Sequence, residues 1–473
     1  MAFNSLHFLL FFPLVTTGAW LLRRHAGLRM LLLLFASYYF YMSWNWKYAG
    51  LLLGSTLLDY VVALGMARTA SIFRRRLLFI ASLSGNLGVL FVFKYYNFFA
   101  DSVAQVAAGL GAPLAAAHHS LLLPVGISFY TFQTLSYTID VYRGQLQPTR
   151  NFLKFALFVS FFPQLVAGPI VRAGHFLPQL DARPRFDDRA AELGLGRIFL
   201  GLFKKICLAD LLGTALVDPV FANPGACSSW TLLLAMYGYA FQIYYDFSGY
   251  SDIALGAAKV LGFELPINFD RPYLATSLRD FWRRWHISLS TWLRDYLYMP
   301  LGGGRGSALR TARNLALVML LGGLWHGAAW GFVLWGALHG LLLGAGRLFH
   351  HVTGIDADRN DQPLVSRLAR VVVTFHLVAG CFVVFRAVEW PLIRAYFGTL
   401  LSFQPGLSVA TPAAYWVLLV ATLYEWVPRA WLREMRRGYL ALPSPAQAGV
   451  LTTALLVFAA VGSGEAPFIY FQF

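Results

Sequence analysis

Two histidines lie within a strongly apolar stretch of the chain. His326 and His339 fall in residues 321–340, LGGLWHGAAWGFVLWGALHG, where every other residue is apolar, aromatic or glycine. An ionisable side chain at membrane depth costs free energy, so it is a functional candidate by default. A histidine that packs helices through a hydrogen bond to a neighbouring carbonyl fits the same pattern, because the flanking glycines let helices approach closely. Position alone leaves both interpretations open for His326.

The spacing between the two histidines predicts different roles for them. His339 follows His326 by thirteen residues, which puts it on nearly the opposite side of a continuous α-helix. We therefore expect His339 to be the histidine that packs between helices, while both interpretations stay open for His326. A neutral imidazole accepts a proton near neutral pH, which suits a general base acting on a hydroxyl. A covalent acyl-histidine is the open alternative.

A third histidine lies in an aromatic and basic segment. His286 falls in residues 279–296, RDFWRRWHISLSTWLRDY, where aromatic and apolar residues recur every three or four positions. This period predicts an amphipathic helix at the membrane surface, with His286 on or beside its apolar face and Trp285 lining a donor site. Arginine binds phosphate in a bidentate manner, so Arg283 and Arg284 could hold a phosphate-bearing acyl donor. The simpler alternative is that they contact lipid phosphates.

Three carboxylates also fall in apolar surroundings. Asp246 and Asp252 lie in residues 244–252, YYDFSGYSD, near the end of an apolar stretch, and Asp59 lies inside another. A carboxylate at Asp246 or Asp252 either orients a histidine or pairs with a nearby arginine, and the structural pairing is the simpler use; Asp59 is likewise expected to be paired within the helix bundle. The sequence holds no serine-nucleophile elbow, phosphate loop or metal-ligand pattern. Its three cysteines are widely spaced, so neither a disulfide framework nor a zinc site is predicted.

The composition places these residues in a membrane. Of 473 residues, 58% are apolar and 13% are charged, about half the charged fraction of a soluble domain. Apolar stretches long enough to cross a bilayer recur from end to end, which predicts one all-α polytopic membrane domain over residues 1–473. The net charge of +16 is scattered between these stretches. Basic residues collect in cytoplasmic loops, whereas nucleic-acid binding needs a concentrated basic face. We therefore expect the lipid bilayer, and no nucleic acid, as the partner of this charge.

Roughly ten to twelve spans are expected. They lie near 6–22, 30–46, 48–67, 77–93, 193–215, 229–247, 314–348, 366–388, 391–403, 411–427 and 447–462. Stretches 119–139 and 152–171 are broken by Pro and Gly, which at membrane depth indicates bent or re-entrant helices lining a cavity. Residues 99–118 predict a surface segment and residues 264–313 a cytoplasmic one. Basic clusters after the first and third spans put the N-terminus on the periplasmic side, with 6–22 as a retained span.

Five ordered runs resemble the membrane-bound O-acyltransferase family, most closely its alginate O-acetylation branch, with the teichoic acid D-alanylation membrane protein more distant. They are SFYTFQTLSYTIDVYRG (128–144), PQLVAGPIVR (163–172), YYDFSGYSDIALG (244–256), NFDRPYLATSLRDFWRRWHISLSTWLRDYLYMPLGG (268–303) and RNLALVMLLGGLWHG (313–327). The likeness covers most of the chain and is dense from about 90 to 345. It implies that the essential histidine is His326 of the WHG run and that His286 accompanies it.

The resemblance implies further features of the fold and the reaction. The fold would be a ring of tilted helices around a thinned centre, with a cytoplasmic funnel for the donor and an outer opening for the acceptor. We expect acetyl-CoA as donor substrate, with no bound cofactor or metal. Trp325 and Trp330 would wall the tunnel against water, and Asn314 and Asp246 would contact substrate. The chain would lie in the bacterial inner membrane and pass acetyl to an exported polysaccharide whose identity the sequence leaves open.

The expected partner is a periplasmic or membrane-anchored hydrolase-like transferase within a polysaccharide export complex. Basic residues 429–437 are expected in the cytoplasm, so span 447–462 would run outward and place the aromatic tail 462–473 on the outer face. The tail would then be either an interfacial anchor or a docking strip for that partner. A polysaccharide or lipid transporter is the rival class. It explains the spans and basic loops equally well, but not a histidine set between glycines and tryptophans. A passive scaffold explains less.

Overall fold

Helices form the architecture of the described chain. The computed structural model describes residues 1–112, 114–182, 184–354, 363–406, 408, 410–461 and 468–469, and within these it contains helices and no β-strand. Six helical segments are long and apolar enough to cross a membrane by length and composition. They are Leu6–Arg24, Ala26–Arg68, Ile72–Gly109, Trp330–Thr353, Leu364–Ala387 and Ser444–Val461. The chain is therefore an all-α, multi-pass membrane protein, as expected.

The individual helices are shorter and more numerous than the apolar stretches suggest. The α-helices are α1 (Leu6–Leu21), α2 (Ala26–Asn45), α3 (Ala49–Arg68), α4 (Ile72–Leu90), α5 (Tyr96–Gly109), α6 (Ile127–Tyr142), α7 (Phe152–Ser160), α8 (Phe162–Leu165), α9 (Ala173–Asp181), α10 (Asp188–Leu202), α11 (Asp218–Ala222), α12 (Ser229–Val260), α13 (Leu278–Arg284), α14 (Ile287–Leu293), α15 (Ala308–His326), α16 (Trp330–Thr353), α17 (Leu364–Ala387), α18 (Trp390–Leu401), α19 (Pro412–Trp426), α20 (Arg429–Leu440) and α21 (Ser444–Val461). Short 3₁₀ and π segments join several of them. Six spanning segments are fewer than the ten to twelve expected, because some segments hold two helices and other apolar stretches are broken.

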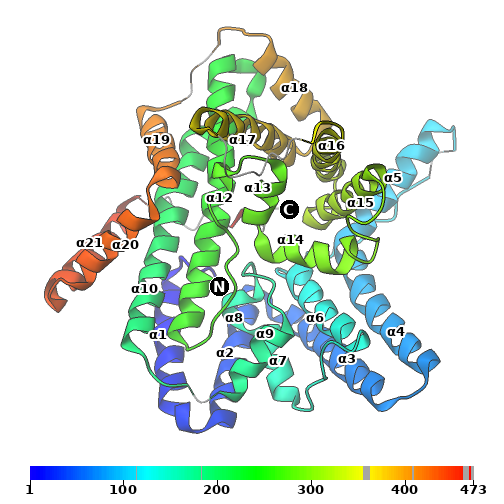
Figure 1. Cartoon of the computed structure of the whole chain (residues 1–473), viewed down its shortest axis with the longest axis vertical. Helices are drawn as coiled ribbons and strands as arrows, with labels where there is room; N and C mark the ends of the chain where they lie inside the picture. The colour runs from blue at the N-terminus through cyan, green and yellow to red at the C-terminus, as the bar shows by residue number, and fades with distance from the viewer. Residues whose placement is uncertain are drawn as a thin grey trace.

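The long helices surround a centre that short helices occupy (Figure 1). Helices α13 and α14 lie in the middle of the view, α10 and α12 run side by side to their left, and α15, α16 and α17 lie above and to their right. The N-terminal helices α1 to α4 fill the lower part. The aromatic and basic segment is therefore at the centre of the fold and not at its edge.

The stretch 152–171 is broken as its prolines and glycines predict. Helix α7 ends at Ser160, α8 forms a single turn, and non-helical chain continues to the start of α9. All of this non-helical chain up to Val171 is buried. The amide nitrogens of Gln133 and Gln164 donate to the carbonyl of Phe158 at 2.6 and 2.8 Å, which satisfies a backbone acceptor freed by the break. Polar side chains thus supply the partners that broken helices need away from water.

The segment 279–296 is not one helix at the membrane surface, and this expectation was wrong. It forms α13 and α14, separated by a break at Trp285 and His286. His286 has φ 43° and ψ 54°, a left-handed conformation that ends one helix and redirects the chain. Trp285 and His286 are 1% and 0% exposed. The break therefore turns the most aromatic part of the segment into the core, where a continuous helix would have left one face outside.

Residues 321–340 are likewise two helices and not one. Helix α15 ends at His326, residues 327–329 are non-helical, and α16 starts at Trp330 and packs back against α15. Gly323 and Gly336 meet where the two backbones touch: a Cβ at either position would overlap a carbonyl oxygen of the other helix. Because His326 and His339 lie on different helices, the angle expected between them on one continuous helix does not apply. Both imidazoles instead contact the Trp335 ring, with centroids 5.2 Å (His326) and 4.7 Å (His339) from it.

The C-terminal part differs from expectation at the tail. The basic residues 429–437 form α20, which has no buried residue. Phe468 and Ile469, the described residues of the aromatic tail, are only 4% and 5% exposed. The ring of Phe468 packs against that of Tyr250 of α12 with centroids 4.8 Å apart, so Phe468 and Ile469 lie inside the protein and not on an outer surface strip. The other aromatic residues of the tail, Tyr470, Phe471 and Phe473, lie outside the described residues.

Candidate functional site

His326 is the last residue of α15, and two neighbouring side chains hold this helix end. Lys94 Nζ donates to the carbonyl of Trp325 at 2.7 Å and to that of His326 at 3.1 Å. The hydroxyl of Tyr95 donates to the carbonyl of Leu324 at 3.0 Å. Terminal helix carbonyls have no partner within the helix, and a cation suits the negative end of the helix dipole. The π-turn Phe91–Tyr95 thus presents two consecutive side chains that fix the position of His326.

The imidazole of His326 lies between aromatic walls beside a small cavity. Its ring centroid is 5.1 Å from that of Trp325, 5.2 Å from Trp335 and 5.3 Å from Phe385. His326 is 5% exposed and lines a cavity of about 270 Å³ between the 122–129 segment, Trp44 and Lys94. A neighbouring cavity of about 440 Å³ shares Lys94 and adds Arg386. A nearly buried imidazole in apolar surroundings, beside an open space, is suited to proton transfer with a bound hydroxyl.

His286 is positioned by a single asparagine from a distant loop. The Asn268 Oδ1 accepts hydrogen bonds from Ser288 N at 3.2 Å and Ser288 Oγ at 2.9 Å, and lies 3.3 Å from His286 Nδ1. The Asn268 carbonyl accepts from Ile287 N at 2.9 Å. The other ring nitrogen of His286, Nε2, has no hydrogen-bond partner among the described residues. Asn268 therefore fixes the backbone turn at His286 and leaves one nitrogen for a further partner.

Trp325 joins the two predicted catalytic histidines. Its ring centroid lies 6.1 Å from that of His286 and 5.1 Å from that of His326. Trp285 has a different setting from the one expected: it packs among Phe269, Phe281 and Phe382 in the aromatic core. Trp330 does not wall the site either, since it is 62% exposed. The structure thus brings together His286, Trp325 and His326, and not Trp285 or Trp330.

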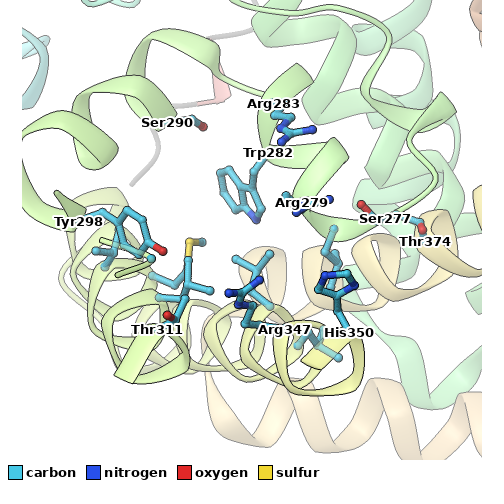
Figure 2. Close-up of a pocket in the computed structure, with 18 of the residues that line it drawn as sticks. Ser277, Arg279, Trp282, Arg283, Ser290, Tyr298, Thr311, Arg347, His350 and Thr374 are labelled. Carbon is cyan, nitrogen blue, oxygen red and sulfur yellow. The ribbon is translucent and has the colours of Figure 1, made fainter. Parts of the chain in front are cut away.

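A larger cavity adjoins this aromatic centre through Trp282, which lines it and contacts Trp335 (Figure 2). It has a volume of about 940 Å³ and is enclosed by α13, α14, α15, α16 and α17. Its basic lining consists of Arg279, Arg283, Arg294, Arg347 and His350. Trp282 stands in the middle of the view, with Arg279 and Arg283 of α13 and Arg347 of α16 around it. The cavity therefore combines apolar walls with a basic rim, which suits an elongated ligand that ends in anionic groups.

The two arginines singled out in the sequence are separated by the fold. Arg283 lines the large cavity. Arg284 points elsewhere, and its Nε donates to Asp280 Oδ1 at 2.9 Å one helical turn earlier. Arg279, one turn before Arg283, shares the cavity wall with it. The helical spacing of four identifies the pair that faces the cavity as Arg279 and Arg283.

Asn314 is a structural tie in this conformation. Its Nδ2 donates to the carbonyls of Leu301 and Gly303 at 3.1 Å each, and its Oδ1 accepts from Arg313. The side chain is fully buried. It therefore pins the glycine turn before α15 to the first turns of that helix, next to the wall of the large cavity that Gly304 forms.

Asp246 and Asp252 pair chiefly with lysines of the π-helical segment Phe203–Asp210. Asp246 lies 2.6 Å from Lys205 Nζ, and Asp252 lies 2.7 Å from Lys204 Nζ. Arg197 adds a second cation to Asp252 at 2.8 Å. The remaining oxygen of Asp246 accepts from the backbone N–H of Ile469 at 2.8 Å, which ties the tail to α12. Asp246 thus makes the structural pairing that the sequence favoured, with a lysine in place of an arginine.

Asp59, in contrast, has neutral hydrogen-bond donors as partners and no cation among the described residues. It is fully buried and accepts hydrogen bonds from Ser82, from Asn86 at 3.0 Å and from Thr138 at 3.2 Å. These partners come from α4 and α6, so Asp59 joins three helices. Within the described part of the chain, no group of three or more His, Cys, Asp or Glu side chains could hold a metal ion.

Sequence reasoning missed the residues that position the histidines. Lys94 lies 232 residues before His326 and Asn268 lies 18 residues before His286. Lys94 had a detectable signal, because it is a lone cation within an apolar stretch. Asn268 had none of its own, since a loop asparagine satisfies many kinds of turn.

Comparison with known proteins agrees with this architecture. The model of the membrane-bound O-acyltransferase family matches residues 146–375. The chain is 44% identical over 406 residues to the protein named probable alginate O-acetylase AlgI of Pseudomonas aeruginosa, covering 84% of this chain and 75% of the relative. It is 39% identical to the Pseudomonas putida protein of the same name over the full length of both. It is 38% identical to the peptidoglycan O-acetyltransferase of Helicobacter pylori, covering 82% of this chain and 77% of the relative.

Proposed function

The chain belongs to the membrane-bound O-acyltransferase family, and on that basis we propose that this O-acyltransferase moves acetyl from cytoplasmic acetyl-CoA across the membrane onto an exported, alginate-like polysaccharide. His326 is the proposed catalytic base and His286 its companion. The names of the similar proteins support an acetyl group and a cell-envelope or exported glycan. They support no choice between uronate, peptidoglycan and other polymers.

One observation carries the proposal: His326 lies between two separate spaces. The small cavity reaches His326 directly. The large cavity is separated from it by two aromatic rings, Trp282 in its lining and then Trp335, whose centroids are 5.8 Å apart. Trp335 in turn lies 5.2 Å from His326. A histidine that borders one cavity and connects to a second one through aromatic rings suits a transfer between a donor and an acceptor that enter separately.

The arginines of the large cavity support a cytoplasmic donor. A series of contacts links basic residues to this cavity: Arg75 donates to the carbonyl of Tyr142, the neighbouring Arg143 donates to that of Asp295, and Asp295 pairs with Arg294 in the cavity lining. Lys and Arg mark the cytoplasmic side of membrane proteins. On this orientation the N-terminus is periplasmic and the chain lies in the inner membrane. The phosphates of acetyl-CoA would meet Arg279 and Arg283, and its acyl end would extend inward past Trp282.

The reaction at His326 would be a direct acyl transfer. Neutral His326 takes the proton of the acceptor hydroxyl as the oxygen attacks the thioester carbonyl carbon. A new ester C–O bond forms, the C–S bond breaks, and the imidazolium returns the proton to the leaving thiolate. Lys94 would hold His326 in place, while Trp325 and Trp335 exclude water that would hydrolyse the thioester. His286 would orient the acceptor from the other side of Trp325.

The final transfer to the polymer is proposed to involve a periplasmic partner transferase. The burial of Phe468 and Ile469 removes them from any docking strip, so the partner surface is expected elsewhere on the outer face. The small cavity and its neighbour, which meet at Lys94, would admit the acceptor on that side.

Sealed membrane vesicles test the donor side and the chemistry together. Acetyl-labelled acetyl-CoA does not cross a membrane, so inside-out vesicles should transfer label and right-side-out vesicles should not. His326→Ala vesicles matched for protein amount should be inactive in both orientations. Equal labelling in both wild-type orientations, or labelling by the His326→Ala protein, would refute the proposed direction or the proposed base.

A further inference from the structure

His339 is a buried histidine without a role in the mechanism above. It is 0% exposed on α16 and sits in an aromatic cage. Its ring centroid lies 4.7 Å from Trp335, 5.3 Å from Trp282 and 6.4 Å from Phe281. Neither its Nδ1 nor its Nε2 has a hydrogen-bond partner among the described residues. A histidine kept only for packing is expected to bond at least one nitrogen to a carbonyl or hydroxyl, because an unsatisfied buried polar group is costly.

Two aromatic neighbours of His339 also carry a buried nitrogen without a hydrogen-bond partner among the described residues. The indole Nε1 atoms of Trp282 and Trp335 are also buried and lack a partner within the described chain. Trp282 lines the large cavity, where Figure 2 shows it beside Arg279 and Arg283. Trp335 reaches His326 at the other end. These three side chains therefore form a row of ring contacts between the donor cavity and the catalytic base, with unpartnered nitrogens along it.

The unpartnered nitrogens define the chemistry of a ligand that could bind along this row of rings. An indole N–H only donates, whereas a neutral imidazole donates from one nitrogen and accepts at the other. The matching ligand has carbonyl oxygens and at least one N–H, and it is narrow enough to pass between aromatic rings. An amide-containing pantetheine arm has these groups. A hydrocarbon chain lacks both, so it would leave every one of these nitrogens unsatisfied.

We propose that His339, with the indole N–H groups of Trp282 and Trp335, binds an amide of the pantetheine arm of the acyl donor and so guides the thioester to His326. The proposal rests on the proposed function, because it assigns the donor side of the same reaction. His339 is thus a binding residue and not a second base. The same arm could belong to CoA or to the phosphopantetheine of a carrier protein.

Two substitutions of His339 separate ligand binding from packing. His339→Phe fills the aromatic cage but removes both polar nitrogens. His339→Gln fits the cage less well but keeps one donor and one acceptor. A packing role predicts that Phe is tolerated and Gln is harmful, whereas the binding role predicts the reverse order. His351, which is exposed on the same helix, provides the matched control His351→Phe.

The readout is the affinity of purified protein in lipid nanodiscs for a non-reactive acetonyl thioether of CoA, with the acetonyl thioether of phosphopantetheine as the second probe. The loss of one hydrogen bond predicts about a tenfold weaker Kd for His339→Phe. His339→Gln should lie within about threefold of wild type and His351→Phe should match it. Trp282→Phe, which keeps a ring and loses the N–H, should weaken binding in the same direction as His339→Phe.

The outcomes distinguish this proposal from the function on which it rests. Wild-type binding of the CoA thioether together with unchanged binding by His339→Phe overturns the role of His339 and leaves the donor assignment standing. Binding by His339→Gln as weak as that by His339→Phe also overturns it. If the wild-type protein binds only the phosphopantetheine probe, and His339→Phe weakens that binding, the role of His339 is supported but CoA is overturned as the donor. Wild-type binding of neither probe overturns both.

Discussion

Replacing Lys94 should disable the enzyme although Lys94 takes no part in the proposed proton transfer or acyl transfer. Lys94→Met keeps the length of the side chain but leaves the carbonyls of Trp325 and His326 without the donors that now lie at 2.7 and 3.1 Å. A hydrogen bond to a charged group contributes about 1.5–3 kcal/mol, so up to about 3–6 kcal/mol holds this helix end in place. The chain would relieve part of that loss by moving the helix end, and His326 with it.

A displacement of about 1 Å at a reacting group can lower the rate about a hundredfold. We therefore expect Lys94→Met to reduce kcat about 10²-fold while the KM for acetyl-CoA stays within about threefold, because the donor cavity does not include Lys94. Lys94→Gln, which can still donate to one carbonyl, should fall between Met and wild type. Lys47→Met replaces an exposed lysine and should behave as wild type.

The assay is the steady-state rate of acetyl transfer by proteoliposomes that contain equal amounts of folded protein. A Lys94→Met protein with wild-type kcat would refute the argument that Lys94 positions His326. A raised KM with unchanged kcat would contradict it equally, since it would place the effect in donor binding.

Three other changes have direct expectations. The double variant Arg279→Gln with Arg283→Gln should raise the KM for acetyl-CoA about tenfold or more at unchanged kcat. Arg284→Gln should leave this KM near the wild-type value, because Arg284 pairs with Asp280. Similar KM values for the double variant and for Arg284→Gln would refute the cavity assignment. Asp246→Ala leaves Lys205 with Asp210 alone, so it should lower the free energy of unfolding by about 3–5 kcal/mol, measured by thermal unfolding in detergent, and an unchanged Tm would refute the pairing. Gly336→Ala places a Cβ against the Met319 carbonyl, whereas Gly380→Ala meets nothing; only the first should reduce the yield of folded protein, and equal yields would contradict the close helix contact.

The parts of the fold that follow from composition were predictable from the sequence. Length and hydropathy sufficed for an all-α membrane protein, and the prolines and glycines of 152–171 predicted its broken helices. The burial of His326 followed from its apolar neighbours. Each of these features depends on residues close together in the chain, where periodicity and solvation act directly.

The arrangement around the histidines was not predictable in this way. The left-handed turn at His286 depends on Asn268 from another loop, and a helical period carries no sign of it. The break after His326 and the contact of α15 with α16 made the angular argument for His339 wrong. The burial of Phe468 requires a partner on α12 that only the folded chain brings near. Long-range packing decided each of these points against a local pattern.

The most direct test of the account is whether acetyl transfer from the thioester depends on His326. Inside-out membrane vesicles contain the native partner transferase and a soluble glycan acceptor in their lumen, together with wild-type protein, His326→Ala or His326→Gln matched for folded protein. They are supplied with labelled acetyl-CoA. We expect label on the glycan from wild type, and a loss of about 10²–10⁴-fold for both variants while binding of the acetonyl thioether of CoA is unchanged. Acetylation at the wild-type rate by either variant would contradict the central claim.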